Sequence, residues 1–364
     1  MNADIAVVGA GIAGASLAAM VGTGATVVLI EAESHPGYHS TGRSAAFWSE
    51  SYGGPLVQPL TTASRAWLED NDFLHPRGCI HIADNAGMSA LDGLADEMVQ
   101  GRVEHHWLDR AALEAAIPAL RPEFAVGLSE PTCRDIDVGG LHSDFLARAR
   151  RSGTRLLTDA AVGKIAYESG EWRIGTRAGD VRARLLVNAA GAWADGIAEM
   201  AGAARLGITP YRRTIAQLMM DPPAAAAMPL VMDALGRFYF KPEAGGRLWL
   251  SPHDETAVVP HDVAAEELDV AIAIDRFEHA VDWRVVRRER AWAGLRSFAP
   301  DRLPVYGFDP RLPDFFWFAG QGGFGIQTAP AAAMIGAALL LGETLPEPVA
   351  GIDVERYAPR RFAL

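Results

Sequence analysis

The N-terminal 31 residues carry the pattern that most limits what this chain can fold into. A short apolar run at residues 5–8 (IAVV) leads directly into a glycine-rich turn at residues 9–14 (GAGIAG). Small and apolar residues at helical spacing follow, and a second apolar run at residues 26–30 ends at Glu31. This order of strand, glycine turn, helix, strand and acid predicts a βαβ unit that binds a dinucleotide.

The glycines of this turn have separate expected roles. Gly9 permits the tight turn, Gly11 lets a pyrophosphate approach the backbone, and Gly14 lets the helix pack closely on the strand. The positive end of the helix then faces the phosphates, and Glu31 accepts hydrogen bonds from an adenosine ribose. A glycine-rich turn without a ligand is the alternative, and this pattern alone leaves both NAD and FAD open as the cofactor.

Net charge and cysteine content exclude several other classes of protein. The net charge of −12 would repel phosphate backbones and anionic lipids, so we expect no nucleic-acid partner and no stable membrane insertion. Two cysteines, Cys79 and Cys133, are too few for a disulfide framework, a four-cysteine zinc site or an iron–sulfur cluster. His75, Cys79 and His81 could in principle hold a metal, but no fourth ligand accompanies them in the sequence, and we expect no metal site.

The start of the chain also bears on where the protein is expected to act. No basic n-region precedes the first apolar run, so we expect no signal peptide there. The longest apolar stretch, residues 329–341, is too short to cross a bilayer and predicts a buried helix. Together with the few cysteines, these features predict a cytoplasmic location.

Five further segments of small, aromatic and polar residues follow the N-terminal unit along the chain. They are residues 40–46 (STGRSAA), 187–195 (VNAAGAWAD), 238–242 (FYFKP), 292–298 (WAGLRSF) and 320–327 (GQGGFGIQ). With the N-terminal unit, these segments resemble the D-amino-acid oxidase, glycine oxidase and sarcosine oxidase family of flavoproteins. Within that family the chain is most similar to D-arginine dehydrogenase, and the resemblance covers nearly its whole length.

This resemblance implies an α/β fold of two interleaved domains. A Rossmann-like FAD-binding domain, with a βαβ unit and a mostly parallel sheet, is expected at residues 1–82, 140–210 and 300–364. An α+β substrate domain built on a mixed or antiparallel sheet is expected at residues 83–139 and 211–299. The FAD is expected to be non-covalent, because the chain has no cysteine in the loop that the family uses for covalent attachment.

The resemblance also implies which residues contact FAD. Val162 should contact the adenine through its backbone, residues 44–46 should line the isoalloxazine ring, and the loop at 322–325 should direct N–H groups toward the N1–C2=O edge. Independently, a helix that begins near Gln327 directs its positive end at this loop, where the reduced flavin gathers negative charge. The expected cofactor-binding residues are Gly9, Gly11, Ile12, Ala13, Gly14, Glu31, Ala32, Thr41, Gly42, Arg43, Ser44, Ala45, Ala46, Val162, Ala190, Gly191, Trp193, Arg296, Gly322, Gly323, Phe324, Gly325, Ile326 and Gln327.

Arg296 is the main candidate for binding a substrate. It lies in a segment with few other charges, so from the sequence it is either buried and paired or directed at a ligand carboxylate. The resemblance implies the second role, in which other arginine and tyrosine side chains complete a carboxylate clamp. The expected catalytic residues are Tyr52, Arg213, Tyr239, Arg296, Gly323 and Gln327.

Three positions depart from the patterns of related enzymes. Cys79 aligns with the acid by which D-arginine dehydrogenase holds the guanidinium of its substrate, and Phe47 aligns with a pocket histidine. A cation buried without its carboxylate is strongly disfavoured, so we expect a substrate with a neutral or apolar side chain. Trp249 aligns with the lysine that sarcosine-type oxidases place over the flavin, which predicts slow reaction with oxygen and hence a dehydrogenase.

These features predict the FAD-dependent oxidative deamination of an amino acid, expected to be a D-amino acid. Hydride would pass from the substrate Cα to flavin N5, and the resulting imino acid would hydrolyse to a keto acid. The expected partners are a small amino acid or amine substrate and an unidentified electron acceptor. The alternatives are a secondary-amine oxidase of the same family acting on N-alkyl or cyclic amino acids, an NAD-dependent dehydrogenase, and a non-catalytic nucleotide-binding module.

Overall fold

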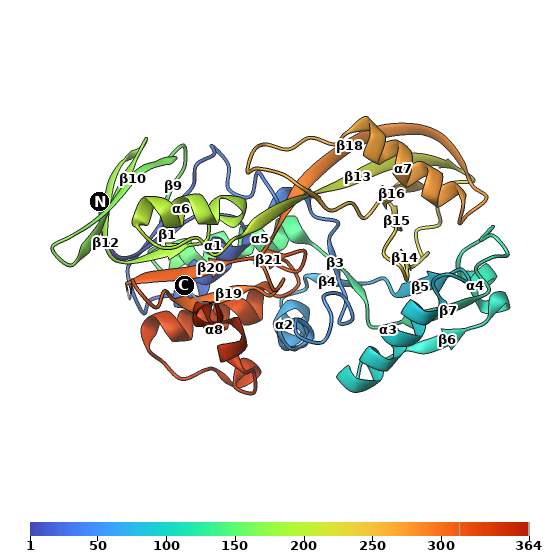
Figure 1. The fold of residues 1–364 in the computed structure, drawn as a ribbon, viewed down its shortest axis with the longest axis horizontal. Coiled ribbons are helices and arrows are strands. Elements are labelled where there is room, and N and C mark those ends of the chain that lie inside the picture. Colours follow the sequence, from blue (N-terminus) through green and yellow to red (C-terminus); the bar gives the residue numbers. More distant parts are fainter. Residues whose placement is uncertain (313, 363–364) are drawn as a thin grey trace.

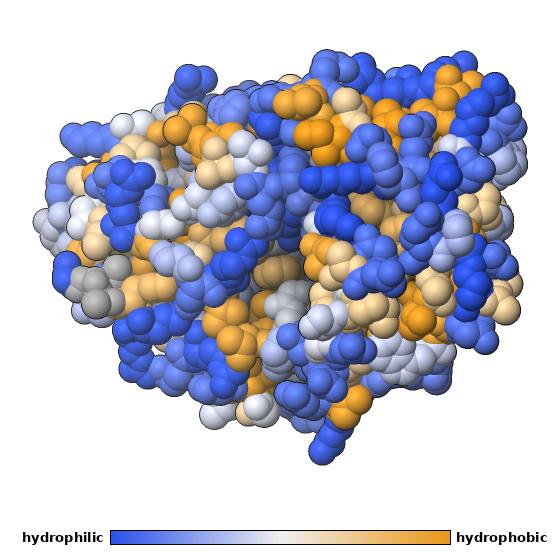
Figure 2. Space-filling view, turned by 45° about the vertical axis from the view of Figure 1, so that its right-hand side comes forward, coloured by the Kyte–Doolittle hydropathy of each residue, from blue (hydrophilic) through white to orange (hydrophobic). Residues whose placement is uncertain are grey.

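The computed structural model describes residues 1–312 and 314–362, and the strands in this part of the chain form three sheets. Figure 1 shows the two larger sheets in opposite halves of an elongated molecule, with β1 and α8 in one half and β5 to β7 in the other. Figure 2 shows one face on which hydrophilic residues predominate and hydrophobic ones lie between them. Such a surface is expected for a chain with a net charge of −12.

The first sheet contains the predicted βαβ unit. Its eight described strands are β1 (Asn2–Val8), β2 (Val27–Ile30), β9 (Arg155–Leu157), β10 (Val162–Glu168), β11 (Glu171–Thr176), β12 (Gly179–Asn188), β19 (Val305–Phe308) and β20 (Phe315–Ala319). β1 lies between β2 and β12 and is parallel to both, so the carboxyl ends of these three strands meet at one edge. The glycine-rich turn leaves β1 at this edge.

Helices cover both faces of the first sheet, which explains why its central strands are apolar on both sides. One face is covered by α1 (Ile12–Val21), α2 (Gln58–Asp70), α5 (Val138–Arg151) and α8 (Ala329–Leu341). On that face Leu17 of α1 and Ile335 of α8 share a buried core with Val187 of β12. On the other face α6 (Ala194–Ala201) packs against Leu186 and Trp317. The helix predicted at residues 329–341 is thus confirmed as a buried helix.

The second sheet is mixed, as expected for the substrate domain. Its ten described strands are β5 (Cys79–Ala83), β6 (His106–Leu108), β7 (Val126–Glu130), β13 (Thr209–Asp221), β14 (Leu230–Asp233), β15 (Tyr239–Glu243), β16 (Arg247–Ser251), β17 (Thr256–Ala257), β18 (Arg284–Phe298) and β21 (Gln321–Gly322). Neighbouring strands are antiparallel apart from β5 and β14, which are parallel. The helix α7 (Glu267–Glu278) packs on this sheet, where the ring of Phe277 lies 5.0 Å from that of Phe240.

The long strands β13 and β18 reach from the second sheet toward the first (Figure 1). They pair antiparallel over most of their length, and this register sets Tyr211 opposite Arg296 and Arg213 opposite Gly294. Because side chains alternate along a strand, Arg213 and Tyr211 lie on one face of β13. The pairing therefore brings two arginines that are far apart in the sequence to the same region of the fold.

The remaining elements are short. They are the strands β3 (Phe47–Trp48), β4 (Leu74–Pro76) and β8 (Arg134–Ile136) of a third sheet, the helices α3 (Met88–Gly101) and α4 (Arg110–Ala116), and the 3₁₀ helices η1 (Thr41–Arg43), η2 (Gly191–Trp193), η3 (Glu347–Val349), η4 (Val354–Tyr357) and η5 (Pro359–Arg361). Within residues 1–312 and 314–362, the helices are all too short or too polar to cross a membrane.

The strand β5 departs from the expected division of the chain. Its residues fall within the segment 1–82 expected in the FAD-binding domain, but β5 pairs with β14 and β7 of the second sheet. These pairings join segments that are far apart in the sequence, and an apolar run does not reveal which partner it will pair with. The α/β fold class is confirmed, whereas the exact domain boundaries stay a prediction.

Candidate active site

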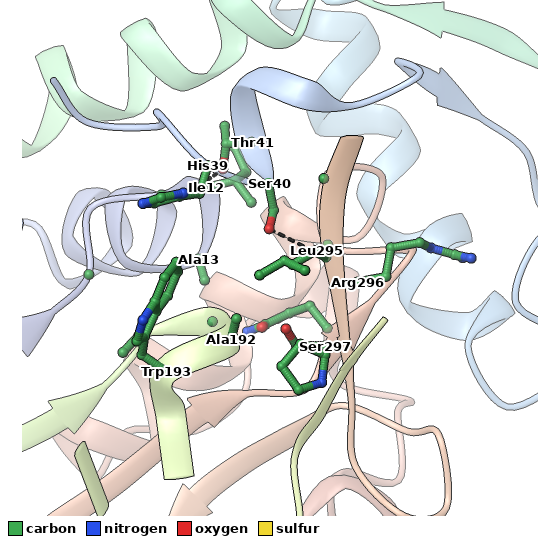
Figure 3. Close-up of a pocket in the computed structure, with 18 of the residues that line it drawn as sticks. Ile12, Ala13, His39, Ser40, Thr41, Ala192, Trp193, Leu295, Arg296 and Ser297 are labelled. Atoms are coloured by element: carbon green, nitrogen blue, oxygen red, sulfur yellow. Dashed lines mark hydrogen bonds between the residues drawn. The ribbon is translucent and has the colours of Figure 1, made fainter. Parts of the chain in front are cut away.

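A cavity of about 870 Å³ runs from the carboxyl edge of the first sheet to the strands β13 and β18. Its walls come from the turn after β1, residues 37–47, the segment around η2, and the loop that follows β20. Figure 3 shows Trp193 near one end of the region and Arg296 on the opposite side. This shape gives the cavity a nucleotide end near β1 and a second end near Arg296.

At the nucleotide end, Glu31 is fixed by backbone donors. Its Oε2 accepts a hydrogen bond from Ala10 N at 2.9 Å, and its Oε1 accepts one from Glu33 N at 3.0 Å. At the start of α1, Ile12 N donates to Thr41 Oγ1 at 2.9 Å (Figure 3). The sequence therefore places an oriented carboxylate and a helix N-terminus at the same end of the cavity, which suits a ribose and a pyrophosphate.

The three glycines of the turn have different surroundings. A Cβ at Gly14 would lie 1.9 Å from Gly9 O, and a Cβ at Gly9 would lie 2.4 Å from Ala189 O, so both positions require glycine for backbone packing. At Gly11 the nearest atom to such a Cβ is Thr41 Oγ1 at 3.1 Å, and the residue lines the cavity. A side chain at Gly11 would thus meet the ligand rather than the fold.

Residues 40–46 connect the nucleotide end to β18. Ser40 Oγ donates to Leu295 O at 2.6 Å, as Figure 3 shows. Arg43 donates through Nη1 to Ala293 O at 3.1 Å and forms an ion pair with Asp262. Ala46 has a φ of 59°, an uncommon value for a residue with a side chain. The segment is therefore held against β18 and lines the middle of the cavity.

The end of the cavity near Arg296 gathers aromatic and cationic side chains. Arg296 Nη2 donates to the Tyr52 hydroxyl at 2.5 Å, and the Arg213 side chain is buried beside it. The ring of Phe47 lies 5.0 Å from that of Tyr52 and 6.0 Å from that of Tyr239. Two arginines and three aromatic rings therefore surround one compartment, which can bind a carboxylate beside an apolar group.

Burial sets the charge states in this compartment. It lowers the pKa of Arg296, which stays cationic, and it raises the pKa of the buried Tyr239 hydroxyl, which stays protonated at neutral pH. Burial, together with the charges of Arg213 and Arg296, lowers the pKa of His253 to about 3. His253 Nδ1 lies 2.8 Å from Gly236 O, which fits a neutral ring that donates to this carbonyl.

The low pKa of His253 predicts an acid-sensitive contribution to stability. Between its ordinary value of 6.5 and about 3, the unfolded chain binds a proton that the folded protein does not. This contribution is therefore fully present above pH 6.5 and is lost progressively as the pH falls toward 3. In His253→Asn, which tolerates the φ of 55° at this position, the fall in melting temperature from pH 7.5 to pH 5 should be smaller than in the wild type. An equal fall in both proteins would contradict the assignment.

Gly323 lies directly beneath Arg296. A Cβ at this glycine would lie 1.6 Å from Nη2 and 2.4 Å from Nε of Arg296. The atoms in its way belong to the end of a flexible side chain, so an added methyl group would move the guanidinium rather than unfold the loop. This close approach is a tertiary constraint that the glycine loop alone does not reveal.

Gly323→Ala should therefore weaken substrate binding while leaving the fold intact. We expect the KM for an amino acid substrate to rise about tenfold, because the guanidinium loses its position against the carboxylate. Gly325→Ala is the matched control, since its Cβ would meet the side chain of Gln321 instead of Arg296. Steady-state kinetics on flavin-loaded protein measure both variants, and equal KM values for the two would rule out this role of Gly323.

Gln327 and Glu130 support Tyr52 and the residues just before it, and the sequence did not indicate Glu130. Gln327 Nε2 donates to Tyr52 O at 3.0 Å and to Thr61 Oγ1 at 2.8 Å. The missed residue is Glu130, whose buried carboxylate accepts hydrogen bonds from Ser51 Oγ at 2.5 Å and Glu50 N at 2.7 Å. Gln327 lines the cavity, but its observed contacts make it a support for Tyr52.

The charge state of Glu130 follows from these contacts. Burial by itself would raise its pKa, but His81, whose Nε2 lies 3.9 Å away, and the hydrogen bonds from Ser51 and Ser49 hold the pKa below the ordinary value. Glu130 is thus an ionised carboxylate that fixes the residues just before Tyr52. Only its proximity to Ser49 and Ser51 in the folded protein reveals this, because 79 residues separate Glu130 from Ser51 in the sequence.

The other expected cofactor-binding residues line the cavity, but Gly14, Gly42 and Phe324 lie outside the described lining. Gly14 and Gly42 instead pack closely against backbone atoms, a Cβ at Gly42 lying 2.8 Å from Gly37 O. Phe324 packs against Tyr52 and Phe298, with ring centroids 5.5 and 5.8 Å away. These three residues shape the walls of the cavity from behind.

Cys79 and Trp249 also lie elsewhere than expected. Among the described residues, the lining of the cavity excludes Cys79, which is buried with Cys133 and Tyr239 and whose Sγ lies 3.6 Å from His81 Nε2. The described residues of β5 all lie outside this lining, and Phe47 and Tyr52, which do line the cavity, pack against the cluster that contains Cys79. Cys79 thus lies behind the cavity wall, and its predicted contact with the substrate stays a prediction.

Trp249 lies outside the described lining as well, and its predicted position over the flavin stays a prediction. Its indole N–H donates to Gln217 Oε1 at 3.2 Å, and Lys241 Nζ lies 5.0 Å from its ring while pairing with Asp135.

Within residues 1–312 and 314–362, no group of three or more His, Cys, Asp or Glu side chains is arranged to hold a metal.

The sequence profile of the FAD dependent oxidoreductase family (DAO) matches residues 4–339, which includes all segments that form the cavity. The chain belongs to this family of FAD-dependent oxidoreductases. The expected family, enzyme class and cofactor are thereby confirmed, and the NAD-dependent and non-catalytic alternatives are wrong.

Individual proteins are similar to this oxidoreductase over much of its length. It is 28% identical to the hydrogen cyanide synthase subunit HcnC of Pseudomonas aeruginosa over 263 residues, which are 71% of this chain and 61% of HcnC. It is 26% identical to glycine oxidase of the same species over 99% of both chains. The crystal structure of L-proline dehydrogenase from P. horikoshii has a TM-score of 0.84 at 22% identity and covers 99% of this chain and 98% of that one.

The residues of this oxidoreductase fit FAD. The Glu31 carboxylate and the N-terminus of α1 suit the adenosine ribose and the pyrophosphate, and the lack of a side chain at Gly11 leaves space between them. The loop at residues 322–325 and the following helix α8 then face the part of the cavity near Arg296. An extended dinucleotide would thus run from β2 to the compartment that holds Arg296 and Tyr52.

Proposed function

We propose that this oxidoreductase oxidises a small amino acid with a neutral or apolar side chain, with D-amino acids as the first candidates. The observation that carries the proposal is the pair of arginines, the buried Arg213 and the partly buried Arg296, beside Tyr52 and Tyr239 at the end of the cavity nearest the glycine loop. Two guanidinium groups and two hydroxyl groups match the carboxylate of an amino acid.

The protein's contribution to the chemistry is mainly positioning. Bound FAD supplies the acceptor for the hydride that leaves the substrate Cα. Arg296 and Arg213 hold the carboxylate, Tyr52 and Tyr239 donate hydrogen bonds to it, and the buried site excludes water. His253 is neutral at physiological pH and lies on the far side of Tyr239, with 5.6 Å between the two rings. The substrate amine would therefore react in its neutral form.

The charges around the compartment support a neutral side chain. Among the described lining residues the acidic ones are Glu31, Glu33 and Asp195, and Glu31 is bound at the nucleotide end. A cationic side chain near Phe47 would lack a carboxylate partner and would lose its hydration. The aromatic rings of Phe47, Tyr52 and Tyr239 instead offer apolar surface. The D configuration rests on the resemblance to D-arginine dehydrogenase.

A secondary amine is the second candidate substrate. Glycine oxidase, by its name, acts on a primary amine, whereas L-proline dehydrogenase acts on a cyclic secondary amine. The carboxylate clamp serves both classes equally, because it does not touch the nitrogen. Phe47 and Tyr239 offer aromatic rings that an apolar N-alkyl group could contact.

We further propose that the enzyme is a dehydrogenase that passes electrons to an acceptor other than oxygen. Trp249 lies outside the described lining of the cavity and does not carry this proposal. A different observation supports the same conclusion: both lysines of the chain, Lys164 and Lys241, lie outside the described lining of the cavity. The lysine that sarcosine-type oxidases use thus has no counterpart among these residues.

An anaerobic screen tests the proposed function. Flavin-loaded protein is mixed with D-, L- and N-alkyl amino acids, and bleaching of the flavin absorbance identifies the substrates. We expect neutral D-amino acids to bleach the flavin faster than D-arginine or D-lysine. Bleaching by amines without a carboxylate, and by none of the amino acids, would overturn the proposal. Reoxidation of the bleached enzyme in air as fast as with an artificial dye would overturn the dehydrogenase assignment.

A further inference from the structure

Arg213 and Arg296, which form the carboxylate clamp, both donate hydrogen bonds to Glu255 of the protein itself. Glu255 lies between β16 and β17, and its Oε1 accepts hydrogen bonds from Arg296 Nη1 at 3.2 Å and Arg213 Nη2 at 3.4 Å. Arg302, which lies outside the described lining of the cavity, donates through Nη2 to both oxygens of Glu255, at 2.9 and 3.0 Å. Its guanidinium carbon also lies 3.9 Å from the ring centre of Phe298. Arg302 thereby anchors the carboxylate in place.

The hydrogen bonds of the clamp show which of its donors remain for a ligand. One nitrogen of Arg296 faces Glu255 and the other faces Tyr52, while Arg213 Nε donates to Asp254 O at 2.8 Å. Glu255 lies outside the described lining of the cavity and retains 36% exposure of its side chain. It therefore acts on a bound substrate through the arginines and through its charge, without touching the substrate.

The positive charge of the arginines at the clamp is partly neutralised by neighbouring carboxylates. Arg213, Arg296 and Arg302 share the single negative charge of Glu255. The neighbouring Asp254 carboxylate accepts hydrogen bonds from Thr214 N at 2.7 Å and Thr214 Oγ1 at 3.0 Å, and it lies 3.9 Å from Arg212 Nε and 3.8 Å from Arg213 Nε. Asp254 therefore offsets part of the charge of Arg213, whereas Glu255 pairs with both arginines of the clamp.

We infer that Glu255 is a specificity residue that tunes the clamp to substrates with one carboxylate and disfavours dicarboxylic amino acids. This inference rests on the proposed function. A first carboxylate would bind the nitrogens that make no hydrogen bond to the described residues, Arg213 Nη1 and Arg296 Nε, because Glu255 accepts from other nitrogens of the two side chains. A second carboxylate in the same compartment would be repelled by Glu255, and the described arginines beside it, Arg213, Arg296 and Arg302, already pair with Glu255. Because Glu255 is partly exposed, solvent screens the repulsion to a moderate strength.

The test compares the binding of acetate and malonate to the flavin-loaded protein, followed by the perturbation of the flavin spectrum. In Glu255→Gln, which keeps the size of the side chain, malonate should bind about tenfold more tightly, because the repulsion of its second carboxylate is removed. Acetate binding should tighten by less than about threefold. Among amino acids, kcat/KM for aspartate relative to alanine should rise by about the same factor as malonate binding.

Two matched variants isolate the charge at this position. Glu255→Asp keeps the charge and should leave the ratio of malonate to acetate affinity within about twofold of the wild type. Glu267→Gln makes the same chemical change in α7, where Glu267 forms an exposed ion pair with Arg288 of β18. This variant should leave the ratio of malonate to acetate affinity unchanged. If Glu255→Gln weakens acetate and malonate equally, Glu255 only positions the arginines and the inference is overturned. An unchanged ratio overturns it as well.

The failure of this inference is distinguishable from the failure of the proposed function. If the wild type binds acetate and Arg296→Met abolishes that binding, the clamp is a carboxylate site whatever Glu255→Gln does. If neither acetate nor malonate perturbs the flavin of the wild type, and no amino acid bleaches it, the clamp assignment itself fails and this inference fails with it.

Discussion

Gly11→Val should yield a folded protein that purifies without FAD. Gly11 precedes α1 with a φ of −68°, which any residue adopts, so valine introduces no strain into the backbone. Its side chain would project beside Thr41 Oγ1 into the space that the pyrophosphate needs. Because a branched side chain cannot share that space with a phosphate, we expect complete loss of bound flavin. The visible absorbance spectrum of the purified protein measures the loss, and circular dichroism checks the fold.

Gly163→Val is the matched control for this prediction. Gly163 is exposed in β10, and a Cβ there would meet no described atom within 4 Å. Valine also suits a strand, so this variant should retain its full complement of FAD. Full flavin content in Gly11→Val would mean that the dinucleotide does not cross the turn after β1. Loss of flavin in both variants would show that the effect is not specific to the turn.

Arg296→Met should lower kcat/KM for every amino acid substrate by about 30- to 1,000-fold. The range corresponds to the loss of a partly desolvated, charge-assisted contact worth roughly 2–4 kcal/mol. Methionine retains an unbranched apolar chain over Gly323 but cannot donate a hydrogen bond, so the carboxylate loses its partner while the loop remains packed. Anaerobic rapid mixing, which follows the flavin absorbance, separates the change in binding from the change in the reduction rate.

Arg296→Lys and an amine without a carboxylate provide the controls. Lysine keeps the charge without the planar fork, so this variant should raise KM by at least tenfold and lie between the wild type and Arg296→Met. An amine that lacks the carboxylate should react equally slowly with all three proteins. If Arg296→Lys keeps kcat/KM intact for every amino acid, then Arg296 is a structural arginine held by Tyr52 and Glu255, and the carboxylate binds elsewhere.

The parts of the fold that could be read from the sequence are those set by local patterns. Residues 5–8 and 26–30 are apolar without alternation, and they form the buried parallel strands β1 and β2. Gly14 is required by its close contact with Gly9 within the βαβ unit itself, and Glu31 receives the backbone N–H of Ala10 within the same unit. Here the sequence distance between partners is short, so the order of residue types largely determines the geometry.

The cavity near Arg296 could be predicted in its residue types but not in its arrangement. Phe47, Tyr52, Arg213 and Tyr239 all line it as expected, because the segments that carry them resemble those of a known family. Cys79 lies behind the lining, buried with Cys133 and Tyr239, because the pairing of β5 with β14 and β7 places the described residues of this strand outside the lining of the cavity.

Only the tertiary structure decided how distant side chains act on one another. The pairing of β13 with β18 brings Arg213 to Arg296, and the return of the chain after β20 sets Gly323 beneath the guanidinium. Glu255 joins the clamp from the loop after β16, and Glu130 supports the segment before Tyr52. These contacts depend on strand register and side-chain direction between segments far apart in the chain, and a single sequence records the residue types but not those directions. By itself, the sequence determined the βαβ unit and the residue types available for the site, while the folded chain determined which of them meet the substrate and which support them from behind.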